Sequence, residues 1–139
     1  MLDQVRLYTL LLARIALGVI FLFHGTQKFL SGVGQTAAFF ESAGIPLASL
    51  AAPAVATVEV VGGVALILGA ALPVFGVLLT LVMLGALAFV HLGNGFSVGE
   101  GGYEYVLALT AGTLAVAFSG GGALAVDTLW QRRRQPAVV

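Results

Sequence analysis

Six ionisable side chains lie inside or at the edges of otherwise apolar stretches of this chain: Arg14, His24, Lys28, Glu59, His91 and Glu104. A charge in hydrocarbon is costly, so it persists where a partner, water or a function stabilises it. Histidines and carboxylates can carry protons, and lysine or histidine can hydrogen-bond a carbonyl or anionic oxygen. These residues therefore either form a working site or hold a helix bundle together.

The composition identifies the bilayer as the natural solvent. The chain has 139 residues, of which 60% are hydrophobic and 9% are charged, whereas a soluble domain carries about 25% charged residues. The formal net charge is zero, so nucleic-acid binding is not expected. Because the chain has no cysteine, it cannot form a disulfide, a thiolate metal site or a thiol relay of its own. The length is typical of one compact domain, residues 1–139.

Four apolar segments predict an all-α membrane protein, a bundle of four transmembrane helices. The spans run over about 7–30, 47–69, 73–92 and 103–119, close to the roughly 20 residues that a helical span needs. The fourth is the shortest and would have to cross with little tilt. Phe39 and Phe40 beside Glu41 predict a short amphipathic helix at the interface between the first two spans.

Basic residues outside the spans predict the orientation. Arg6 precedes the first span, and Arg132, Arg133 and Arg134 lie in the tail, residues 120–139. With four spans both termini share one side, which we expect to be the cytoplasmic side of a bacterial-type inner membrane. The triple arginine would also contact anionic lipid, and Trp130 would lie near the cytoplasmic headgroups.

The inner half of the bundle is expected to contain an ion pair. At about 1.5 Å per helical residue, Arg14 lies roughly 10 Å and Glu59 roughly 15 Å from the cytoplasmic face. An Arg14–Glu59 pair would lower the cost of burying both charges. It would fix the register of two helices or, alternatively, gate a proton conduit.

The outer half collects a second polar layer. His24 and Lys28 are four residues apart and share a helix face. His91 ends the third span and Glu104 opens the fourth on the same side, with Asn94 close by. These five residues are the candidates for ligand binding, and the alternative is that they only snorkel to the headgroups. A metal site is not expected, because the helical His-x-x-x-His and Glu-x-x-His spacings are missing.

Six different short motifs follow one another along nearly the whole chain. They are Arg14-Ile-Ala-Leu-Gly18, Phe21-Leu-Phe-His24-Gly25-Thr-Gln-Lys28, Glu59-Val-Val-Gly62-Gly63, His91-Leu-Gly-Asn94-Gly-Phe96, Gly102-Tyr103-Glu104-Tyr105 and Ser119-Gly-Gly-Gly122 through Asp127. Together they resemble the DoxX family of four-span membrane proteins. One departure is the apolar stretch 123–126 before Asp127, which is more polar in many relatives.

The resemblance implies a four-span membrane protein. Some relatives are associated with membrane redox chemistry, including thiosulfate oxidation coupled to quinone, and with oxidative-stress complexes, whereas most members have no defined activity. The leading hypothesis is a subunit or accessory of a membrane oxidoreductase that binds a quinone-like or other small ligand in the outer layer. Without a flavin or metal motif, electrons would come from a soluble or membrane partner protein. The alternatives are a non-enzymatic scaffold or cargo-binding protein, which distant relatives resemble, and a small transporter or proton conduit working as a homo-oligomer.

Overall fold

A computed structural model describes residues 1–134, with side chains as far as Trp130. Every regular element within these residues is helical, which confirms the all-α expectation. The elements are α1 (Leu2–Leu30), α2 (Val33–Ser42), α3 (Ala48–Leu68), α4 (Leu72–Ala86), the π-helical turn η1 (Leu87–His91), the 3₁₀ turns η2 (Leu92–Asn94) and η3 (Val98–Glu100), α5 (Glu104–Ser119) and α6 (Val126–Arg134).

The long apolar helices confirm a membrane-spanning protein. Leu2–Leu30, Ala48–Leu68 and the continuous helical segment Leu72–Asn94 are each long and apolar enough to cross a bilayer. The fourth apolar helix, α5, has 16 residues, which correspond to about 24 Å at 1.5 Å per residue against a hydrocarbon core of about 30 Å. The first span begins earlier than expected, because α1 continues through its polar N-terminal residues.

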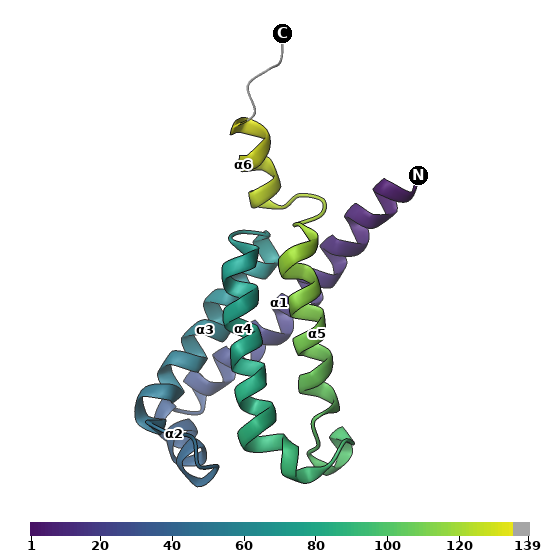
Figure 1. The fold of residues 1–139 in the computed structure, drawn as a ribbon. Helices are drawn as coiled ribbons and strands as arrows, with labels where there is room; N and C mark the ends of the chain where they lie inside the picture. The colour runs from purple at the N-terminus through teal and green to yellow at the C-terminus, as the bar shows by residue number, and fades with distance from the viewer. Residues whose placement is uncertain (135–139) are drawn as a thin grey trace.

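The four apolar helices pack as neighbours: α1 against α3, α3 against α4, α4 against α5, and α5 against α1. Figure 1 shows α3 and α4 meeting at a tight turn at the upper end and diverging toward the lower end. The N-terminus and α6 lie at the upper end, whereas α2 and the segment between α4 and α5 lie at the lower end. The protein therefore has a terminal end, near α6, and a loop end, near α2.

Glycines set the distance between α1 and α3. A Cβ atom on Gly18 would lie 2.7 Å from the carbonyl oxygen of Gly63, and one on Gly25 would lie 2.8 Å from the Cβ of Glu59. There is no room for a Cβ atom at either glycine, so the two helices are in close contact at both places, as small residues allow in membrane helices. These two contacts fix the register of α1 against α3.

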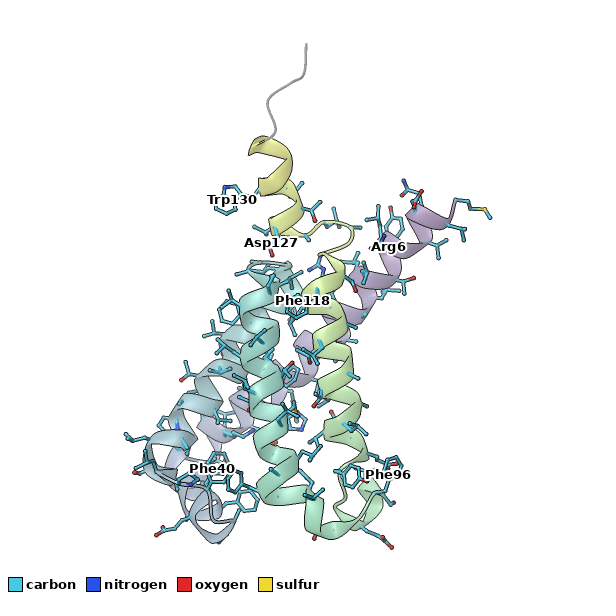
Figure 2. All side chains as sticks on the ribbon, in the orientation of Figure 1. Arg6, Phe40, Phe96, Phe118, Asp127 and Trp130 are labelled. Carbon is cyan, nitrogen blue, oxygen red and sulfur yellow. The ribbon has the colours of Figure 1, made fainter. Side chains whose placement is uncertain are left out.

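The first turn of α6 closes the terminal end of the fold (Figure 2). The Asp127 carboxylate accepts hydrogen bonds from the backbone N–H groups of Ala71 (2.8 Å) and Leu72 (2.9 Å). Those donors lie at the N-terminus of α4, where N–H groups lack intrahelical partners. The Asp127 N–H in turn donates to Gly69 O at 3.0 Å. The side chains of the triple arginine, expected to mark the cytoplasmic side, lie outside the described residues.

Candidate functional site

A large cavity lies at the loop end of the fold. Its volume is about 720 Å³, within the roughly 300–1,000 Å³ typical of ligand sites. Apolar side chains of α1, α3, α4 and α5 make most of its walls, and Phe39 and Phe40 of α2 close one end. Small residues of α3 and α4, such as Ala54 and Gly85, leave the space open where the two helices diverge.

A few polar side chains reach this cavity from four elements. His24 and Lys28 come from α1, Glu59 from α3, His91 from η1 and Tyr105 from α5. Few and convergent polar groups in an otherwise apolar cavity are the usual pattern of a ligand site. Three of the five ligand-binding candidates from the sequence therefore line the same cavity: His24, Lys28 and His91.

Lys28 and Glu59 form an ion pair at this cavity. The distance from Lys28 Nζ to Glu59 Oε2 is 2.6 Å, and the side chains are 23% and 4% exposed. Gly25 makes the contact possible, because its missing Cβ lets α1 lie directly against the α3 backbone at Glu59. A carboxylate this deeply buried needs such a partner, since an unpaired charge would be very costly.

The expected Arg14–Glu59 pair was wrong. Arg14 is 1% exposed and donates hydrogen bonds to the carbonyl oxygens of Leu66 (3.1 Å), Ile67 and Ala123 (2.9 Å). The antiparallel register that brings Gly18 to Gly63 and Gly25 to Glu59 places Arg14 beside the last turn of α3. Carbonyl groups at a helix end lack their usual donors; Leu66 O accepts from the Gly69 N–H as well as from Arg14, and the guanidinium supplies the donor for Ile67 O.

The two histidines are both oriented by backbone carbonyls. His24 Nδ1 lies 2.9 Å from Ile20 O, and His91 Nδ1 lies 2.7 Å from Gly101 O. A carbonyl oxygen only accepts, so each Nδ1 carries the hydrogen and each neutral ring keeps Nε2 as an acceptor. The His24 ring also lies near that of Tyr105, with ring centroids 6.4 Å apart. His91 sits in a π-helical turn, a feature frequent at functional sites.

Asn94 lies in the connection between α4 and α5, Glu104 begins α5, and neither is among the cavity-lining residues. Asn94 Nδ2 is 3.3 Å from both Val90 O and Gly101 O. Glu104 Oε1 accepts a hydrogen bond from the Val98 N–H at 2.7 Å. Both residues thus hold the backbone of the connection that follows His91.

Two cavity residues were not assigned to the outer layer from the sequence. Glu59 was expected deeper, with Arg14, because depth was estimated without the register of α1 against α3. The sequence pattern predicts Glu104 and not Tyr105 as a ligand-binding residue, although adjacent helical residues point about 100° apart. That rotation was the available signal, since it turns Tyr105 away from the connection that holds Glu104. Within residues 1–134, no group of three or more His, Asp or Glu side chains is placed to hold a metal ion.

Known proteins have sequences similar to this one. The DoxX family model matches residues 9–92, a stretch from α1 to η2 that includes both members of the Lys28–Glu59 pair. The protein named "Putative oxidoreductase CatD" of Bacillus subtilis is 38% identical over 117 residues, covering 84% of this chain and 83% of its own length. An uncharacterized protein of Haemophilus influenzae is 33% identical over 130 residues, covering 91% and 93%. No solved structure gives a significant match. The chain therefore belongs to the DoxX family of membrane proteins.

Proposed function

We propose that this protein binds a quinone-like amphiphile in the cavity, as a subunit or accessory of a membrane redox system. The observation that carries the proposal is the cavity itself, which is about 720 Å³ in volume and apolar except for five polar side chains. Such a space fits a flat polar ring attached to an apolar chain. The divergence of α3 and α4 would admit the chain from the bilayer.

The residues present fit a quinone ring. Its two carbonyl oxygens accept hydrogen bonds, and the Lys28 ammonium and the Tyr105 hydroxyl are donors at the cavity wall. Phe40 and Phe89 supply aromatic surface that can lie against a ring, edge-on or offset. A quinone supplies two-electron redox chemistry when it is bound, and the side chains described here position its ring and provide protons.

The redox part of the proposal is supported by the relative from Bacillus subtilis, whose name describes an oxidoreductase. The chain has no cysteine to carry electrons as a dithiol. We therefore propose that electrons come from a partner protein. We also propose that the membrane is the bacterial cytoplasmic membrane, with the terminal end of the fold on the cytoplasmic side.

A cavity-filling variant tests this function. Gly85 lines the cavity, and a Cβ added there meets no atom within 4 Å. Gly85→Leu should therefore fold and occupy ligand space. Binding of ubiquinone-2 to purified protein in lipid nanodiscs, measured by calorimetric titration, should weaken by about tenfold or more, a loss of at least about 1.4 kcal/mol.

Gly34→Leu is the matched control, because Gly34 on α2 also has open space around it and lies outside the cavity lining. It should bind ubiquinone-2 like the unmodified protein. The proposal fails if the unmodified protein binds neither ubiquinone-2 nor menaquinone-2. It also fails if Gly85→Leu binds as well as Gly34→Leu.

A further inference from the structure

A second, smaller hollow adjoins the cavity at the loop end. Its volume is about 310 Å³, many times the roughly 30 Å³ that a water molecule occupies in the liquid. It lies between the end of α1 and α2, and its lining residues are Gln27, Lys28, Ser31, Gln35 and Thr36, with Phe39 and Phe40. Five polar side chains around a space of this size can supply the hydrogen-bond partners that water molecules need.

Lys28 belongs to both spaces. It lines the hollow and the cavity, as do Phe39 and Phe40, whereas Glu59 lines the cavity alone. The Lys28 side chain is 23% exposed and the Glu59 side chain 4% exposed, with 2.6 Å between Nζ and Oε2. Lys28 therefore lies at the boundary between the two spaces, and Glu59 lies beside it on the cavity side. Phe39 and Phe40 lie at the same boundary.

We infer that Lys28 and Glu59 form a proton pathway that connects water in the hollow with a proton acceptor bound in the cavity. The Lys28 ammonium gives a proton to Glu59 Oε2, which leaves a neutral amine and a carboxylic acid. The amine regains a proton from water in the hollow, which leaves a hydroxide ion that exchanges with the solvent, and the acid passes its proton to the acceptor. One proton moves from water to the acceptor, both residues return to their ionised forms, and no electron moves.

Other titratable groups face Glu59, and none of them offers the same connection. His24 of α1 interacts with it electrostatically, and His91 of η1 and Tyr105 of α5 share its cavity. The residues that α2 and α4 contribute to the cavity walls include no titratable side chain. Among the described residues that line either space, Lys28 alone is titratable and reaches both.

Infrared spectroscopy after a rapid pH jump tests the pathway on the protein in nanodiscs without added ligand. The protonated-carboxyl signal of Glu59 is assigned by its loss in Glu59→Gln. Lys28→Met should slow proton exchange at Glu59 by roughly 100-fold, the lower end of what a positioned proton donor contributes. Gln35→Trp, which fills the hollow from an exposed position, should slow it as well and does not disturb the ion pair.

Gln4→Trp is the control, because Gln4 is exposed at the other end of α1 and lines neither space. It should exchange at the rate of the unmodified protein. Unchanged exchange in Gln35→Trp overturns the pathway, as does the absence of any signal that depends on Glu59. The pathway rests on the proposed function only for the identity of the acceptor. Failure to bind ubiquinone-2 would count against the proposed function and leave the exchange measurement intact.

Discussion

Arg14 and Lys28 lie on the same helix and stabilise the fold by different means, because they meet different parts of α3. Lys28 meets a carboxylate, that of Glu59. Arg14 meets the last carbonyl groups of α3, at Leu66 and Ile67, and also the tail at Ala123. A helix C-terminus carries a partial negative charge. Arg14 is therefore compensated by backbone groups, which leaves Glu59 for Lys28 and for the cavity.

Removing the Arg14 guanidinium should destabilise the protein without touching the cavity. Arg14→Met removes the guanidinium that donates to Ile67 O and Ala123 O, while Leu66 O keeps the Gly69 N–H, and should lower the free energy of unfolding by about 3 kcal/mol. Arg6→Met is the control, since Arg6 is exposed and its guanidinium lies 3.4 Å from Ser119 O; it should change stability by no more than about 0.5 kcal/mol. Denaturant unfolding in detergent micelles measures both, and equal effects would contradict the role given to Arg14.

At the scale of elements, the α1–α3 contact decides where the site lies. Gly18 and Gly63 approach at one place and Gly25 and Glu59 at another, so α1 cannot slide along α3. Packing of this kind contributes strongly to membrane helix association, where apolar burial contributes little. The same contact brings Lys28 and Glu59 together and places Arg14 at the end of α3.

A methyl group at Gly25 should disturb this contact. Its Cβ would lie 2.8 Å from the Glu59 Cβ and from the Val60 backbone nitrogen. Gly25→Ala should therefore lower stability by about 1–3 kcal/mol, the usual cost of overpacking. Gly34→Ala has open space at its Cβ and should raise stability by about 0.5–1 kcal/mol, because alanine favours a helix. Thermal unfolding of both variants decides, and a neutral or stabilising Gly25→Ala would refute the close approach.

On the scale of the whole molecule, the elements divide between two ends. Arg6, Asp127 and Trp130 lie at the terminal end, and Phe40 and Phe96 lie at the loop end (Figure 2). The buried Arg14 contacts and the Asp127 cap hold the terminal end together. The cavity and the hollow both lie at the loop end, where α3 and α4 have diverged. Polar contacts thus hold the terminal end of the fold together, and the cavity lies at the loop end.

Single cysteines can report this division, because the chain has none of its own. Gln4→Cys and Leu129→Cys are exposed at the terminal end, and Ser42→Cys and Ser97→Cys are exposed at the loop end. In cells, a membrane-impermeant maleimide should label the loop-end pair from outside and reach the terminal-end pair only after permeabilisation. Opposite accessibility of positions 4 and 129 would mean that the 16-residue α5 does not cross the membrane.

Helices and their polar ends could be predicted from the sequence, because hydropathy over about 20 residues is a local property. The candidate layer was partly recovered in the same way. His24 and Lys28 share a helix face, and His91 ends a span on the same side, so all three reach the cavity walls. The sequence also predicts the correct end of the bundle for Asn94 and Glu104, but both side chains form hydrogen bonds with nearby backbone groups.

The amino-acid sequence by itself determined the class of protein, its membrane-crossing helices and the end at which polar residues gather. Only the tertiary structure decided which charges pair. The partner of Glu59 depends on the register of α1 against α3, and that register is set by glycine contacts from both helices at once. The cap that Asp127 places on α4 joins positions far apart along the chain. The cavity exists because α3 and α4 diverge below their turn, a property of two packed helices that neither sequence segment contains alone.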